Sequence, residues 1–491
     1  MTQEPPVVTK SFVRFEQQHI LPIPETERTG TSKSIFAIWV GLNMMPLTVV
    51  TGAVATGAYS LPIGWSIAAL LIGNVIGAFG SALHASQGPH LGIPQMLQAR
   101  AQFGYLGGGL FALIAFIMFM GFFVGILIVA KDALLAVFPG VNGSVAIIGF
   151  AAVGIALCVF GFDLLRKTMV YISILIAIAV TVSMVMLWLQ PEVTASRNDA
   201  EFTLEGFFAV LAIGVVWQLA YAPYVSDYTR YLPKKTGPKT AFWSTYLGLV
   251  LSSVFVMTLG VLLGAANPDN PLAALGDHLG GLGLVVLLVF AVTSALINGV
   301  ELYSAVMNAL TGIQSSFKNV VITSGTRVWT TVVCGVVATV VALLGQGDFM
   351  TAFDNFLSLL LYVLVPWSAI NLVDYFVVKK GHYTIGDLFD RTGGQYGRWN
   401  LVGLGSYAIG FLAQVPFMIT ALYTGPMAAP LHNVDIAWLV GFVVTVIVYL
   451  VWVKLAPNGG TRTVEEFSAE AAPAATPTHI PPPRAPPPPP P

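Results

Sequence analysis

Runs of about twenty predominantly apolar residues recur along this chain, and they constrain its fold more than any other feature. The run ALIAFIMFMGFFVGILIVA, residues 112–130, has no charged residue and is long enough to cross a bilayer as one helix. Only 9% of the 491 residues are charged and 56% are hydrophobic, whereas about a quarter of the residues of a soluble domain are charged. The chain is therefore predicted to be an all-α integral membrane protein.

Hydropathy in windows of this length predicts twelve transmembrane helices. The predicted spans are 35–58, 63–84, 106–131, 144–162, 168–190, 204–231, 240–265, 280–312, 326–345, 352–378, 398–423 and 434–455.

The loops between these spans alternate in charge. Of the 22 lysines and arginines, only Lys131 and Arg197 fall on the side whose other loops are acidic or neutral. Because basic loops stay in the cytoplasm, this alternation places both termini there and supports a multi-pass protein of the inner or plasma membrane.

The two ends of the chain differ from the rest in composition. Residues 1–34 are polar and charged and are predicted to form a cytoplasmic tail, and 456–491 are predicted to be a disordered proline-rich tail. The net charge of −1 argues against a nucleic-acid partner. The two cysteines lie in apolar runs, and the sequence indicates neither a disulfide nor a metal centre, and no cofactor.

The first and sixth predicted helices each contain a proline with polar or flexible neighbours at membrane depth. The first contains GLNMMP, Gly41 to Pro46, and the sixth contains AYAPYVSDYTRYLP, Ala220 to Pro233. Five helices separate them, so they run in opposite directions, as in an inverted repeat of two five-helix units with discontinuous first helices. We therefore expect repeats at 35–190 and 204–378, followed by two further helices at 398–455. The alternative is that each proline only kinks a helix.

Polar residues surround the second break. Trp217, Gln218 and Tyr221 precede Pro223 at membrane depth and are candidates for contact with a ligand, because an unwound turn in lipid must line a polar cavity. Asp227 and Arg230 stand at i and i+3 and are predicted to pair for anchoring or gating, although an ordinary interfacial ion pair would have the same spacing.

Glu301 is the one acidic residue that the predicted spans place in mid-membrane. Its carboxyl is expected to face the interior of the bundle and to carry a proton or contact a ligand. Asn298 is on the same face and could offer an amide to a planar polar heterocycle. A structural role for a neutral glutamic acid is the alternative. Phe119 and Phe122, in the third span, could stack on such a ring or only pack.

Five stretches resemble the nucleobase–cation symporter-1 family, in its purine/cytosine permease branch. They are GLNMMPLTVVTGA, GPHLGIPQMLQARAQFGY, APYVSDYTRYLP, INGVELYS and YVLVPWSAINLVDYFVVKKGHY. The resemblance covers about 35–455. It implies a fold like that of the amino-acid and hydantoin transporters, with a flat heterocycle held between helices 1, 3, 6 and 8.

Carried over position by position, the resemblance implies a substrate site made of residues from these four helices. They are Asn43, Met44, Met45, Phe119, Phe122, Trp217, Gln218, Tyr221 and Asn298, to which the buried acid adds Glu301.

The identity of the coupling ion is inferred from a departure from the family pattern. Leu296 and Ile297 stand where sodium-dependent relatives are expected to have two hydroxyl residues, and their side chains offer no oxygen to a hard cation. A proton carried by Glu301 is therefore predicted. Thr293 and Ser294, one turn earlier, are the alternative ligands if the ion is sodium.

Together these features predict a proton-coupled symporter that imports a nucleobase or related planar heterocycle, such as cytosine or a purine, by alternating access. A sodium-coupled symporter for hydantoin or allantoin-type compounds is the alternative. The histidines are expected in tails and loops, so the helices lack the cluster that an enzyme would need. Two broken helices without a ring of pore charges argue against a channel.

Overall fold

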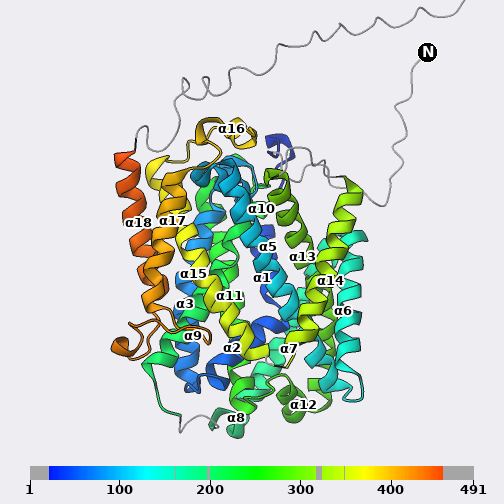
Figure 1. The fold of residues 1–491 in the computed structure, drawn as a ribbon. Helices are drawn as coiled ribbons and strands as arrows, with labels where there is room; N and C mark the ends of the chain where they lie inside the picture. Colours follow the sequence, from blue (N-terminus) through cyan, green and yellow to red (C-terminus); the bar gives the residue numbers. More distant parts are fainter. Residues whose placement is uncertain (1–21, 161, 196–199, 317–322, 348, 457–491) are drawn as a thin grey trace, which may run out of the picture.

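The computed structural model describes residues 22–160, 162–195, 200–316, 323–347 and 349–456, and they form a bundle of helices that run along a common direction (Figure 1). No strand occurs among these residues. Most of the proline-rich tail, from 457 on, and residues 1–21 of the N-terminal tail lie outside the described residues. The prediction of an all-α protein is confirmed.

Eight helices within the described part of the chain are long and apolar enough to cross a membrane. A ninth span is formed by α1 (Ser32–Asn43) and α2 (Pro46–Gly57), which are bent by 60° at their break. Three shorter apolar stretches, Gly143–Val159, Ile174–Trp188 and Leu401–Phe417, belong to α6 (Gly143–Phe160), α7 (Phe162–Trp188) and α17 (Leu401–Gln414) with the turn that follows it. Each of the twelve predicted spans overlaps one of these elements, but the exact number of membrane crossings stays a prediction.

The remaining long helices are α3 (Ile63–Ala85), α5 (Gln95–Val137), α9 (Leu204–Leu219), α11 (Gly237–Ala266), α13 (Gly281–Ser316), α14 (Ser324–Gly345), α15 (Phe349–Val373) and α18 (Ala437–Leu455). The short helices lie at the two ends of the bundle. They are α4 (Gly88–Leu91), α10 (Val225–Thr229), α16 (Ile385–Phe389), α8 (Pro191–Ala195) and α12 (Ala273–Leu279).

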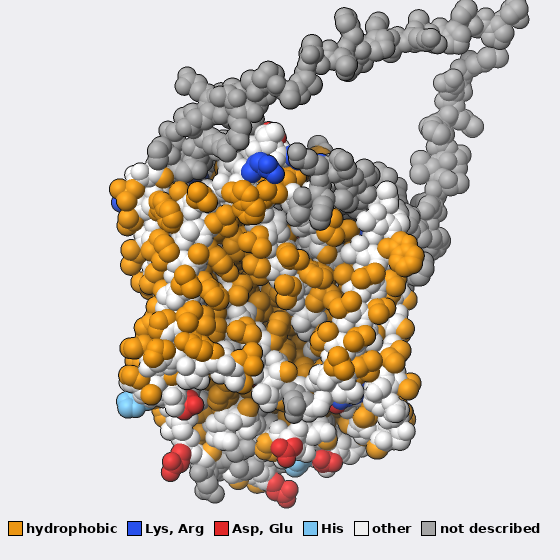
Figure 2. All heavy atoms as spheres, in the orientation of Figure 1, with side chains coloured by type: hydrophobic (Ala, Val, Ile, Leu, Met, Phe, Trp, Pro, Cys, Tyr) orange, Lys and Arg blue, Asp and Glu red, His pale blue; other side chains and the backbone are white. Residues whose placement is uncertain are grey.

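The two ends of the bundle carry opposite charge. We call the end with α10 and α16 the basic end and the end with α8 and α12 the acidic end (Figures 1 and 2). Figure 2 shows an apolar belt between them, with lysine and arginine above it and most of the acidic side chains below it. This distribution is expected of a bundle that displays its apolar side chains to lipid and its charges to water.

Both predicted breaks are present, and they occur in helices of opposite direction. The first span leaves the helical conformation at Met44 and Met45 and restarts at Pro46. The second ends at Leu219 and continues through a 3₁₀ turn, Ala222–Tyr224, into α10. The first span runs from the basic end towards the acidic end, and α9 runs back (Figure 1). A further interruption occurs in α5, where Gly104 has a φ of 81°.

Close packing against α11 holds α2, the helix that follows the first break, in position. A Cβ on Gly260 would lie 1.9 Å from the carbonyl oxygen of Val49, and a Cβ on Gly52 would lie 2.1 Å from that of Met257. Only glycine permits such contact between the two backbones, because any side chain would have to displace a helix.

We expect the substitution Gly260→Val to destabilise the protein by about 3 kcal/mol, the upper end of the usual effect of overpacking, because it would push α2 away from α11. Thermal unfolding in detergent should show this as a marked fall in Tm. Gly149→Val is the matched control, since Gly149 is exposed and has no atom within 4 Å of a built Cβ. Equal melting temperatures for the two variants would contradict this account of the packing.

Candidate functional site between the two broken helices

The side-chain oxygen of Asn43 joins the two broken helices. It accepts hydrogen bonds from Nε1 of Trp217 at 3.0 Å, from the hydroxyl of Tyr221 at 2.8 Å and from Oγ of Ser253 at 2.7 Å. Its amide nitrogen donates to the carbonyl oxygen of Trp39 at 3.0 Å. Asn43 is the last residue of α1 and is fully buried, so the three donors fix the end of α1 against α9 and α11.

Aromatic rings surround this polar junction. The rings of Phe122 and Trp217 meet edge to face with centroids 6.0 Å apart, and the ring of Phe119 lies 5.0 Å from that of Tyr224. The ring of Trp39 lies 5.6 Å from that of Tyr221. Residues from α1, α5, the end of α9 and the turn that follows it thus form an aromatic cluster at the level of the breaks.

Glu301 faces the same cluster from α13. It is 8% exposed, and its carboxyl is close enough to interact electrostatically with the hydroxyls of Tyr221, Tyr224 and Tyr228. Its Oε2 has no hydrogen-bond partner among the described residues. A buried carboxyl oxygen without a partner is costly, so this atom is placed to take up a proton or a ligand.

Two of the predicted ligand contacts point elsewhere in this conformation. Nε2 of Gln218 donates to Oδ1 of Asn74 at 2.5 Å and to the carbonyl oxygen of Leu249 at 3.2 Å, so this amide lies between α3 and α11. The Cβ of Asn298 lies 3.4 Å from a Cβ built on Gly154, so Asn298 faces α6. Both side-chain polar atoms of Asn298 are buried and have no described partner.

The other predicted residues are also buried. Met44 and Met45 are each 5% exposed and form the break itself. The hydroxyl of Thr293 donates to the carbonyl oxygens of Val289 and Phe290 within its own helix. The Oγ of Ser294 has no described partner.

The predicted pair Asp227 and Arg230 lies at the basic end. A carboxylate oxygen of Asp227 accepts from the backbone nitrogen of Gln95 at 2.9 Å. Nε of Arg230 donates to the backbone oxygen of Asp227 at 3.3 Å, and the guanidinium lies over the ring of Tyr231. The bond from Gln95 attaches α10 to the start of α5, and these contacts of Arg230 are with its own neighbours in the chain.

A polar network that the sequence did not reveal closes the basic end. Asp374 accepts hydrogen bonds from Tyr383, Tyr449 and Gln102, and Gln87 donates to Asn371 at 2.9 Å. Nδ2 of Asn371 donates to Oε1 of Gln102 at 3.3 Å, so the network links α5, α15 and α18 with Gln87, which follows α3.

His84 extends this network, with Nε2 2.8 Å from Oγ of Ser368. It is fully buried within α3, so the expectation that every histidine lies in a tail or loop is wrong. The only sign of this network in the sequence was the concentration of amides and tyrosines in two of the stretches that resemble the family.

A cavity opens on the opposite side of the cluster, at the acidic end. Among its lining residues are Val216, one position before Trp217, and Tyr59, whose hydroxyl donates to Asp354 at 3.1 Å. Burial raises the pKa of the Tyr59 hydroxyl and that of the Asp435 carboxyl, which also lines the cavity. The aromatic cluster therefore lies between a closed basic end and a partly hollow acidic end.

We expect Asn43→Leu to destabilise the protein by about 1–3 kcal/mol or more, because it removes the acceptor of three buried donors and leaves them unsatisfied. Ser253→Ala removes one donor and leaves the other two bonds, so its effect should be clearly smaller. Thermal unfolding of both variants in detergent measures the difference. A larger loss for Ser253→Ala would show that the junction does not depend on Asn43.

The chain matches a known family over residues 22–441, described as permease for cytosine/purines, uracil, thiamine, allantoin. It is 37% identical to YxlA of Bacillus subtilis (strain 168), an inferred purine-cytosine permease, over 90% of this chain and 96% of the relative. It is 26% identical to the purine-cytosine permease fcyB of Emericella nidulans over 89% of this chain and 88% of the relative.

Its fold matches that of Mhp1, a nucleobase-cation-symport-1 family transporter solved in a closed conformation with bromovinylhydantoin bound. The TM-score is 0.69 at 17% sequence identity, and the match covers 91% of this chain and 96% of Mhp1. These relatives are permeases and not enzymes, which confirms the prediction that this chain is a transporter. The chain belongs to the family of permeases for cytosine/purines, uracil, thiamine and allantoin.

Proposed function

We propose that this protein is a symporter that imports a nucleobase or related planar heterocycle, such as cytosine or a purine, and that the aromatic cluster around Asn43 and Glu301 is its substrate site. The observation that carries the proposal is the unpartnered Oε2 of Glu301, whose carboxyl interacts electrostatically with Tyr221 and Tyr224 at the second break. A flat ring with polar edges matches both features, because it can stack on an aromatic face and hydrogen-bond at its edge.

The contacts in the described conformation suggest how binding would proceed. Trp217 and Tyr221 already use their polar hydrogens on Asn43, so their rings offer stacking surfaces and not new donors. Glu301 retains free hydrogen-bonding capacity at the substrate edge. Contacts from Gln218 and Asn298 stay predictions and would require both side chains to exchange their present neighbours.

We further propose that the coupling ion is a proton carried by Glu301. A neutral carboxylic acid can donate to a substrate nitrogen or carbonyl and can later release its proton when the site opens to water. The alternative is a sodium ion at Thr293 and Ser294 with a hydantoin or allantoin-type substrate. The unpartnered Oγ of Ser294 is the observation in its favour.

The closed basic end and the hollow acidic end support alternating access. We propose that 35–190 and 204–378 are inverted repeats that rock against each other, with 398–455 as an added helix pair. The basic end would face the cytoplasm of a cell with this protein in its inner or plasma membrane, which places both termini inside. Asp227 and Arg230 would then belong to the inner gate.

A thermal-shift screen of the purified protein against nucleobases tests the site, because a ligand that binds only the folded state raises the Tm. We expect Trp217→Ala to weaken binding by about 1–3 kcal/mol, the value of one stacked base. Trp329→Ala is the matched control, since Trp329 is 71% exposed on α14. A nucleobase shift that survives Trp217→Ala unchanged in a folded protein would exclude this site.

Glu301→Gln separates coupling from binding. In proteoliposomes this variant should lose accumulation against a gradient and keep substrate exchange, because glutamine can hydrogen-bond but has no proton to release. Glu192→Gln, an exposed carboxyl in α8, should transport normally. Wild-type uptake should survive removal of sodium and collapse with an uncoupler. Normal accumulation by Glu301→Gln, or uptake that requires sodium, would contradict proton coupling.

A further inference from the structure

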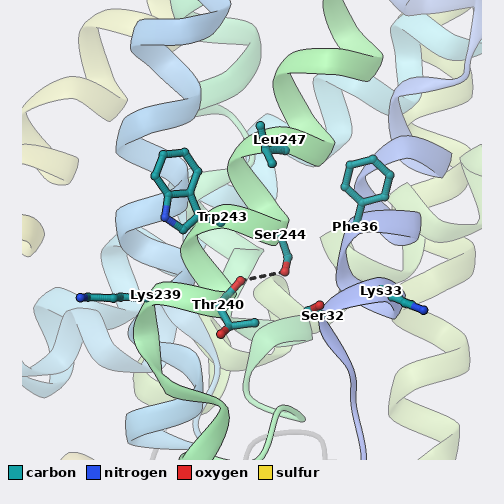
Figure 3. Close-up of a pocket in the computed structure, with 8 residues that line it drawn as sticks. All are labelled: Ser32, Lys33, Phe36, Lys239, Thr240, Trp243, Ser244 and Leu247. Atoms are coloured by element: carbon teal, nitrogen blue, oxygen red, sulfur yellow. Dashed lines mark hydrogen bonds between the residues drawn. The ribbon is translucent and has the colours of Figure 1, made fainter.

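A surface groove lies between α1 and α11 at the basic end, away from the aromatic cluster (Figure 3). Its volume is about 480 Å³. The lining residues come from the first turns of the two helices: Ser32, Lys33, Phe36, Lys239, Thr240, Trp243, Ser244 and Leu247.

The groove exists because the two helices touch at one level and separate beyond it. A Cβ on Gly248 would lie 2.9 Å from the Cβ of Trp39 and 3.1 Å from the carbonyl oxygen of Phe36. Nε1 of Trp39 donates to Oγ1 of Thr245 at 3.1 Å. These contacts hold α1 and α11 together beyond the inner end of the groove.

The groove changes from polar to apolar along its length. Figure 3 shows Phe36 on α1 and Trp243 on α11 on opposite sides of it, with Leu247 farther from the helix ends. These three side chains are 37%, 55% and 43% exposed. Lys33 and Lys239 lie nearer the ends and extend outwards on either side, where their flexible stems leave the ammonium groups free to turn.

No acidic side chain in the lining of the groove balances the positive charge of its lysines. Both ionisable lining residues are lysines, and no aspartate or glutamate is among the eight. Two lysines beside an exposed aromatic and aliphatic wall, at the boundary of the apolar belt, match the two parts of an anionic phospholipid. Lysines near a membrane surface attract anionic lipid, and their contributions add.

We propose that this groove binds one anionic phospholipid of the adjoining leaflet, with the lipid phosphate between Lys33 and Lys239 and an acyl chain along Phe36, Trp243 and Leu247. A soluble phosphate would gain nothing from the apolar wall, and a zwitterionic lipid would gain less from the lysines. The bound lipid would bridge α1, which carries the first break, to α11, which supports that break from behind.

Native mass spectrometry of the delipidated full-length protein, titrated with phosphatidylglycerol, tests the proposal. We expect one phosphatidylglycerol to bind at least about ten-fold more tightly to wild type than to the double variant Lys33→Gln/Lys239→Gln, from the loss of two lysines. The matched control is Lys234→Gln/Lys235→Gln, because these exposed lysines lie at the same end and outside the groove. The control should retain the wild-type affinity.

Two further measurements, on a variant of the apolar wall and with a competing phosphate, identify the ligand. Trp243→Ser should weaken phosphatidylglycerol and phosphatidylcholine alike, and inorganic phosphate at the same concentration should not compete. Equal losses for the two double variants would mean general attraction to a basic surface and would overturn the proposal. Phosphatidylcholine binding as tightly as phosphatidylglycerol, or competition by inorganic phosphate, would also overturn it. Unchanged melting temperatures establish that the variants are folded.

Discussion

The acceptance of three hydrogen bonds by one amide oxygen is the interaction on which the centre of this protein depends. A helix that ends in the middle of a membrane leaves backbone and side-chain polar groups that lipid cannot satisfy. At the end of the first broken helix, Asn43 satisfies its side-chain oxygen by accepting hydrogen bonds from Trp217 and Tyr221 of the second broken helix and from Ser253 of α11. The two breaks are thus one structural unit, and movement of either helix must strain or exchange these bonds.

Several buried polar groups near this unit lack a hydrogen-bond partner among the described residues: Oε1 of Gln218, Oγ of Ser294, both polar atoms of Asn298 and Oε2 of Glu301. Gln218 donates to Asn74 and Leu249, and Asn43 is fully engaged. The Glu301 carboxyl interacts electrostatically with Tyr221, and its Oε2 has no hydrogen-bond partner among the described residues. Of these unpartnered side chains only Glu301 has a carboxyl, so it is the one whose charge can respond to substrate or to water.

The sequence predicted those features that depend on composition along the chain. Apolar length located the helices. Pro46 and Pro223, each with polar or flexible neighbours, located the breaks, whereas Pro366 lies within the uninterrupted helix α15. The sequence was less informative about the direction in which a side chain points from its helix. Trp217 and Gln218 are adjacent, yet one faces Asn43 and the other Asn74. Ser253 and His84 lie in ordinary apolar segments, so only their tertiary neighbours identify their roles.

The two ends of the bundle differ in the free energy needed to open them. At the basic end, Asp374 is held by Tyr383, Tyr449 and Gln102 in a buried network. Opening there must break several buried hydrogen bonds at once, which is costly until water replaces them. At the acidic end the cavity beside Val216 is narrowed by contacts such as that of Tyr59 with Asp354. A transporter of this construction therefore needs the free energy of substrate and ion binding at its centre to open the basic end. The hydrogen bonds of Asn43 connect the two broken helices, and through them this free energy can act on both helices.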